Sequence, residues 1–192
     1  MKTYAQALFL AIPLALAPFA QAQHQTFTVV PDQSKVDFLL GGNTHHVQGV
    51  FHVQSGSIEF DPDSGKISGS VIVDAGSGNS GEASRDKKMN TDVLDTAHFA
   101  QVTFTPSSYQ GTIAPSGDST IQVAGIFTLH GTPHDLTVPM QIHVEGANLT
   151  AKGHFTVPYV KWGLKDPSIF ILKVAKEVNI DLMLSGHLDR GN

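Results

Sequence analysis

Residues 121–157 read IQVAGIFTLHGTPHDLTVPMQIHVEGANLTAKGHFTV, and through most of this stretch apolar side chains occupy every second position. Such alternation is typical of β-strands that bury one face. It predicts strands at residues 121–129, 136–144 and 149–157. The connections between them are shorter than the crossover that a parallel pair requires, so we expect antiparallel neighbours.

The same alternation continues on both sides of this stretch. It predicts further strands at residues 36–40, 47–53, 58–60, 67–73, 102–104, 170–174 and 178–184. Such a set of antiparallel strands must close into a barrel or stack as a sandwich. A barrel is favoured by glycines at apolar-face positions, where strands bend sharply or leave interior space, namely Gly49, Gly69, Gly125 and Gly153. The residues between Asp61 and Gly65 have the composition of a tight turn.

One segment interrupts the strands and is predicted to form a short helix of about ten residues. SRDKKMNTDVLDTAHFAQVTF, residues 84–104, begins with charged residues and carries Arg85, one of only two arginines. It follows GSGNSG at residues 76–81, which matches the dinucleotide-binding pattern G-x-G-x-x-G. That site requires a longer helix followed by a parallel strand, so we interpret the glycines as a flexible connection.

The first 22 residues have the features of a secretory signal peptide. Lys2 precedes an apolar run at about residues 7–19, and small residues lead to a predicted cleavage site after Ala22. The remaining residues, 23–192, are predicted to form one barrel domain. The apolar run is shorter than a membrane span. We therefore expect a periplasmic or secreted protein.

The composition excludes several classes of function. With no cysteine, the chain has no disulfide, no thiolate nucleophile and no Cys-ligated metal. Its net charge of -5 is spread without long runs, which argues against nucleic acid as a partner. No Ser-His-Asp order with supporting motifs is present, and the paired acids have the positions of turn and helix-start residues. The sequence thus predicts a protein without catalytic activity or a dedicated cofactor.

Ten histidines raise the alternative of a metal-binding protein or metalloenzyme. His45, His46 and His52 are close in sequence and form the candidate ligand set. No H-E-x-x-H motif occurs, and Pro133 prevents His130 and His134 from sharing a helix. Surface and turn positions account for these histidines, so no metal site is predicted, and the metal-binding function stays an alternative.

Four stretches together resemble one known family. They are HHVQGVFHVQSGSIEFD (45–61), SRDKKMNTDVLDTAHFAQVTF (84–104), IFTLHGTPHDLTVPM (126–140) and VPYVKWGLKDPSIFILKVAKEVNIDLMLSG (157–186). In order and spacing, from about Phe27 to Leu188, the chain resembles the YceI-like, polyisoprenoid-binding proteins. The resemblance implies an all-β, eight-stranded antiparallel lipocalin-like barrel, with one short helix on its side. It also implies a long cavity for an isoprenoid or fatty lipid tail.

Candidate site residues follow from the predicted strand faces and this implied cavity. The cavity candidates are Phe38, Phe51, Val53, Val71, Val73, Met89, Phe104, Phe127, Met140, Ile142, Phe155 and Trp162. Candidates for holding an anionic head group are Arg85, Lys87, Lys88, Lys161 and Lys165, because basic side chains pair with phosphate oxygens. A second interpretation of Arg85 is that it pairs with Asp86 or another carboxylate and anchors the helix.

These observations lead to one main functional hypothesis and leave others open. The main hypothesis is a non-catalytic carrier or binding protein for a polyisoprenoid, an isoprenoid quinone or a similar lipid. Besides the metal alternative, a stress-related structural protein with an incidental cavity stays open. Transient membrane contact and a homodimer are compatible with the sequence and not specified by it.

Overall fold

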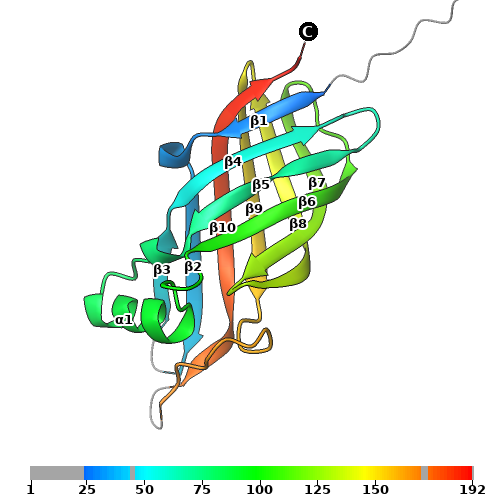
Figure 1. Cartoon of the computed structure of the whole chain (residues 1–192). Helices are drawn as coiled ribbons and strands as arrows, with labels where there is room; N and C mark the ends of the chain where they lie inside the picture. The colour runs from blue at the N-terminus through cyan, green and yellow to red at the C-terminus, as the bar shows by residue number, and fades with distance from the viewer. Residues whose placement is uncertain (1–23, 44–45, 170–172, 192) are drawn as a thin grey trace, which may run out of the picture.

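Ten β-strands form a single antiparallel sheet in the computed structural model, which describes residues 24–43, 46–169 and 173–191. They are β1 (Gln25–Val29), β2 (Lys35–Gly42), β3 (Val47–Phe51), β4 (Val53–Phe60), β5 (Ile67–Asp74), β6 (Gln101–Gly111), β7 (Gly117–Leu129), β8 (Thr132–Glu145), β9 (Asn148–Val157) and β10 (Val174–Asp189). Pairing of β1 with β10 closes the sheet on itself (Figure 1).

The ten strands occupy eight positions around the barrel. β1 and β2 follow each other along the same edge of β10, separated only by the 3-10 turn η1 (Pro31–Gln33). β3 and β4 likewise follow each other along β2 and β1, with a break at His52. The fold is therefore a closed eight-stranded antiparallel β-barrel, which confirms the predicted class.

Strand boundaries differ from the prediction where alternation is locally broken. The short strand predicted at 102–104 extends to Gly111. The prediction ended too early because a register shift between Pro106 and Ser108 interrupts the alternation of apolar and polar residues. The two closing strands predicted at 170–174 and 178–184 are wrong as separate elements. Val174–Asp189 form the single strand β10, with a register shift between Val174 and Val178. Residues 170–172 lie outside the described part of the chain.

The predicted helix is present and has two parts. After the 3-10 turn η2 (Ala75–Ser77), the helix α1 (Ala83–Lys88) continues directly into the π-helical turn η3 (Met89–Val93). Glu82 caps the start, because its carboxylate accepts the backbone N–H groups of Ser84 and Arg85. The segment ends at Leu94, after which Asp95 takes a left-handed φ of 46°.

This helical segment completes the barrel wall at one end. β3 pairs with β2 along one edge, and within the described residues its other edge makes only the isolated bridge Val50–Asn79. β5 ends at Asp74, so the wall between β3 and β6 lacks a strand below that point. α1 lies beside β2 and β3 at this lower end (Figure 1). It is therefore a structural part of the wall.

The opposite end of the barrel is closed by packed side chains and a tight turn. Phe60 is buried there, and the buried Tyr109 hydroxyl donates a hydrogen bond to the backbone oxygen of Asp61 at 3.1 Å. The Asp61 carboxylate accepts the Ser64 hydroxyl at 2.6 Å, which lowers the pKa of Asp61. The turn predicted from Asp61 to Gly65 is confirmed by its Gly65 N–H to Asp61 oxygen bond of 2.9 Å.

The predicted signal peptide, residues 1–22, lies outside the described residues, so its assignment stays a prediction. Among the described residues, no helix combines the length and the apolar composition that crossing a bilayer requires.

Candidate functional site: an elongated apolar cavity

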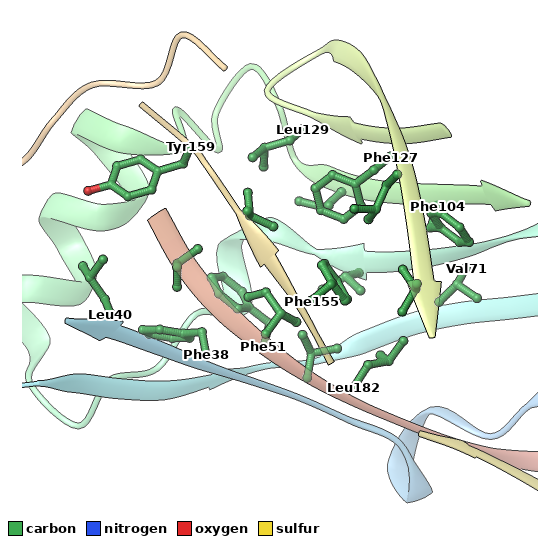
Figure 2. Close-up of a pocket in the computed structure, with 18 of the residues that line it drawn as sticks. Phe38, Leu40, Phe51, Val71, Phe104, Phe127, Leu129, Phe155, Tyr159 and Leu182 are labelled. Atoms are coloured by element: carbon green, nitrogen blue, oxygen red, sulfur yellow. The ribbon is translucent and has the colours of Figure 1, made fainter. Parts of the chain in front are cut away.

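The interior of the barrel contains a cavity of about 580 Å³. Its wall includes residues from every strand and from the helical segment 83–94. Aromatic and aliphatic side chains point into it from opposite strands, as Phe38, Phe51, Phe127 and Phe155 show in Figure 2. The volume falls within the range of about 300–1,000 Å³ that is usual for small-molecule sites.

Most of the predicted cavity residues lie on this wall. They are Phe38, Phe51, Val71, Val73, Met89, Phe104, Phe127, Met140, Ile142 and Phe155. They share the inner face because side chains two positions apart on a strand point to the same side of the sheet. Met89 reaches the cavity from η3, and η3 lies where the wall lacks a strand.

Two of the predicted residues do not line the cavity. Val53 is buried at 4% exposure but lies outside the wall, directly after the break at His52 and beside a register shift. The Trp162 ring stacks on the His134 ring, with centroids 4.0 Å apart, and it also lies 5.8 Å from the Phe127 ring. Trp162 therefore packs behind Phe127 and closes the core.

Several wall residues were absent from the sequence-based set. From the helical segment they include Val93 and Leu94, and from the connection after β9 they include Tyr159, Leu164 and Ile169. The spacing of Met89 and Val93, four residues apart, could have indicated a shared helix face. The connection after β9 has no periodic pattern, so no signal identified its inward residues.

The glycines on strand faces make room for neighbouring side chains. A β-carbon on Gly153 would lie 2.6 Å from the sulfur of Met140, and one on Gly49 would lie 2.6 Å from Cε1 of Phe38. Contacts this short would force the neighbour to move. The space that we predicted above these glycines is therefore occupied by Met140 and Phe38, which themselves line the cavity.

The polar part of the wall is concentrated at the end that carries α1. The solvent-exposed wall residues are Asn43, Glu82, Ser84, Lys88, Ile169 and Lys173. Toward the opposite end the wall contains buried residues such as Phe60 and Leu149. The cavity therefore opens to solvent beside α1 and is closed at the far end.

Tyr159 lies near this mouth, and its hydroxyl does not offer a free polar group to the cavity. The hydroxyl donates a hydrogen bond to the backbone oxygen of Ala175 at 2.7 Å. Burial raises its pKa to about 12, so the group stays protonated at neutral pH. The ring thus adds an apolar surface to the wall, as the labelled side chain in Figure 2 shows.

Arg85 lines the mouth and is held by Ser80. Its Nε donates to the Ser80 hydroxyl at 2.7 Å, and its second terminal nitrogen donates to the Ser80 backbone oxygen at 2.8 Å. The Ser80 hydroxyl and backbone N–H both contact the carboxylate of Asp86. Among the described residues, no carboxylate lies within ion-pair distance of the guanidinium, so the predicted direct pair of Arg85 with Asp86 is wrong.

The other head-group candidates divide into two groups. Lys88 lies on the cavity wall together with Arg85. Lys87, Lys161 and Lys165 are exposed and lie outside the wall, and Lys165 forms an ion pair with Asp92 at 3.7 Å. Lys173, which is not among the sequence-based candidates, is on the wall. The wall cations of the mouth are therefore Arg85, Lys88 and Lys173.

Replacing Ser80 with Ala is expected to destabilise the helical segment. Loss of the Ser80 hydroxyl removes the group that binds both the half-buried Arg85 Nε and the Asp86 carboxylate, which costs about 1–3 kcal/mol of folding free energy. Urea unfolding measures the loss of free energy, and hydrogen exchange of residues 83–93 locates it. Ser84→Ala is the control, because its exposed hydroxyl contacts only the exposed Glu82 carboxylate. Equal stability of the two variants would contradict the anchoring role.

Of the histidines proposed as metal ligands, the two that the structure describes lie at the two ends of β3. His46 lies just before β3 and His52 between β3 and β4, and both are exposed. His45 is outside the described residues. Within the described ranges, no three His, Cys, Asp or Glu side chains form a group that could hold a metal ion.

Comparison with known proteins finds relatives along most of the chain. The model of the YceI-like domain matches residues 27–185. A UPF0312 protein of Vibrio parahaemolyticus is 28% identical over 143 residues, covering 72% of each chain. A UPF0312 protein of Shewanella is 29% identical over 150 residues, covering 73% of this chain and 74% of the relative.

Solved structures show the same fold. BcnA of Burkholderia cenocepacia aligns with a TM-score of 0.67 at 26% identity, covering 82% of this chain and 99% of BcnA. A domain from Saccharophagus degradans, described as polyisoprenoid-binding, aligns with a TM-score of 0.64 at 14% identity, covering 85% of this chain and 98% of that domain. By its sequence match and its closed barrel, the chain belongs to the YceI-like domain family.

Proposed function

We propose that this protein is a non-catalytic binding or carrier protein for a long-chain isoprenoid or a similar amphiphilic lipid. The observation that carries the proposal is the cavity of about 580 Å³, which is apolar along its length and polar only at its open end. An amphiphile has the same distribution of apolar and polar groups. The tail would lie along the barrel, and the head group would lie beside α1.

The energetics of an apolar tail are consistent with this arrangement. Burial of each methylene contributes about 0.8 kcal/mol, so two or three isoprene units supply roughly 10 kcal/mol before ordering costs. Met89 and Met140 provide flexible, polarisable contacts for an irregular tail. Affinity would therefore come mainly from desolvation of the tail.

The mouth supplies groups suited to an anionic head. Arg85, Lys88 and Lys173 bring three cations to one end of an otherwise apolar wall. Arg85 uses Nε and one terminal nitrogen to bind Ser80, whereas Lys88 and Lys173 are exposed and have no carboxylate of the described residues within ion-pair distance. We assign the phosphate or carboxylate of the lipid to this cluster.

Related structures support the proposal at the level of the fold. The Saccharophagus domain is described as polyisoprenoid-binding, and at 14% identity it shares only the architecture with this chain. A Campylobacter jejuni YceI mutant has been crystallised with a monobromobimane guest, at 14% identity and a TM-score of 0.57. For this chain, the proposed class of ligand rests on the residues of its own cavity wall.

The predicted signal peptide supports a location outside the cytoplasm. A periplasmic carrier would shield a water-insoluble tail between membranes, which requires no catalytic group. The sequence feature is the apolar run before Ala22. Detection of the mature protein in the periplasmic or culture fraction, with Gln23 as its first residue, would support this location.

Native mass spectrometry of the gently purified protein, followed by organic extraction, tests the function directly. We expect a bound species of several hundred daltons that enters the organic solvent. Stoichiometric zinc with an empty cavity would overturn the proposal in favour of the metal-binding alternative. An empty protein that also fails to bind added geranylgeraniol in calorimetry would leave only a structural role.

A further inference from the structure

Basic residues are concentrated at the mouth of the cavity. Seven of the twelve Lys and Arg residues lie within residues 85–88, 161–165 and 173–176. The first group is on α1 and the second is in the connection after β9, both at the lower end of the barrel in Figure 1. In the third group Lys173 directly precedes β10 and Lys176 lies near its start, where the Val160 N–H donates to the Lys176 backbone oxygen at 3.3 Å. We call these residues the basic rim.

The acidic residues near the basic rim are mostly engaged in local contacts. Glu82 accepts backbone N–H groups at the start of α1, and Asp166 accepts the Ser168 N–H at 2.9 Å. Asp86 binds Ser80, and Asp95 contacts His98 at 2.9 Å. Hydrogen bonding holds the pKa of Glu82 and Asp166 below the usual range, so both are ionised at neutral pH.

Apart from Lys165, the rim lysines have no carboxylate of the described residues within ion-pair distance. Lys165 pairs with Asp92. Four rim lysines are exposed and have no carboxylate of the described residues within ion-pair distance, namely Lys87, Lys88, Lys161 and Lys173. Their charge is therefore available to an external anion.

The rest of the molecule has the opposite charge. Residues 82–95 and 161–177 contain seven Lys and Arg against six Asp and Glu, whereas the remainder has five against eleven. An anionic surface would repel the body of the barrel and attract the rim. This asymmetry selects one orientation, with the mouth facing the surface.

An apolar side chain accompanies the basic rim. Ile169 is 53% exposed, more than the other exposed large hydrophobic side chains of the described residues, Leu39 at 40% and Ile126 at 37%. Ile169 also lies on the cavity wall at the mouth. Basic groups combined with an exposed apolar side chain are the features of proteins that bind at membrane interfaces.

We propose that the basic rim docks this protein onto an anionic lipid bilayer with the cavity mouth toward the membrane. The positive rim matches the negative surface, and Ile169 enters the interface beside the mouth. A lipid tail would then pass between bilayer and cavity with little exposure to water. The docking is a property of the outer surface, and it goes beyond lipid binding inside the barrel.

Vesicle cosedimentation of the full mature chain tests the proposal. The probes are vesicles of phosphatidylglycerol mixed with phosphatidylcholine, and vesicles of phosphatidylcholine alone. We expect binding to the mixed vesicles only, and loss of binding at high salt. Each lysine near an anionic surface strengthens partitioning about fivefold, so the loss of two lysines in Lys87→Glu combined with Lys161→Glu should weaken it at least about 25-fold.

A matched control changes the net charge equally at positions away from the mouth. Lys66→Glu combined with Lys152→Glu alters the turn at the closed end and the outer face of β9, both exposed. This variant should lower vesicle binding only slightly. Equal loss in both double variants would overturn the docking surface, as would equal binding of the wild type to both kinds of vesicle or to neither.

Parallel calorimetry with geranylgeraniol separates this proposal from the proposed function. Lys87 and Lys161 lie outside the cavity wall, so the rim variant should keep its affinity for this neutral probe. If the wild type binds vesicles but not the probe, the carrier function fails and the docking stands. If it binds the probe but not the vesicles, the docking fails alone.

Discussion

Replacement of Ala151 with Trp is expected to weaken binding of a long isoprenoid tail about 1,000-fold. Ala151 lies on the cavity wall, pairs in register with Ile142 and Leu184, and belongs to the closed half of the barrel. An indole there would fill the space that the end of the tail occupies. Excluding about five carbon atoms removes about 4 kcal/mol of binding free energy, which corresponds to that change.

Calorimetry with two neutral probes of different length measures this effect. Geranylgeraniol should lose affinity, whereas the shorter geraniol, which does not reach the closed end, should bind as it does to the wild type. Lys152→Trp is the matched control, because the neighbouring side chain on β9 is exposed on the outer face. Unchanged affinity of Ala151→Trp for geranylgeraniol would show that the tail does not enter the closed half.

The combined change of Lys88→Gln and Lys173→Gln should weaken binding of geranylgeranyl phosphate about 100-fold. Both lysines lie on the wall of the mouth. For exposed residues, a charge-assisted hydrogen bond contributes about 1.5 kcal/mol, the low end of its range. The loss of one such bond weakens affinity about tenfold for each lysine. Geranylgeraniol, which has the same tail and no charge, should bind both proteins equally.

Lys87→Gln provides the control for this prediction. Lys87 precedes Lys88 on α1 and is exposed, but it lies outside the cavity wall. Its loss should leave the affinity for the phosphate probe within about twofold of the wild type. If Lys87→Gln weakens that affinity as much as the double variant does, the effect comes from general attraction at the rim and not from a head-group site.

The sequence predicted those parts of the structure in which apolar and polar side chains alternate regularly along the chain. Alternating side chains point to opposite faces of a strand, so residues 121–129 and 136–144 identified β7, β8 and their inner faces directly. The same rule selected Phe104, Phe127 and Phe155, which line the cavity. Loss of alternation after Asp74 marked the helical segment in the same way.

Irregular positions were not predictable from the same rule. The break at His52 moves Val53 off the cavity wall, and the shift at Pro106 conceals most of β6. The pairing of β1 and β2 along one edge of β10 joins residues more than a hundred positions apart. Such pairings depend on how the whole sheet closes, and no short window of sequence contains that information.

The sequence alone determined the strand faces, the antiparallel connections and the one helix, because each depends on neighbouring residues. Only the tertiary structure decided which cations share the mouth and what Arg85 binds. Lys173 reaches the wall while Lys161 does not, and Arg85 contacts Ser80 in place of Asp86. The physical reason is that both outcomes depend on where the closed barrel places segments distant in sequence and on side-chain directions outside regular strands.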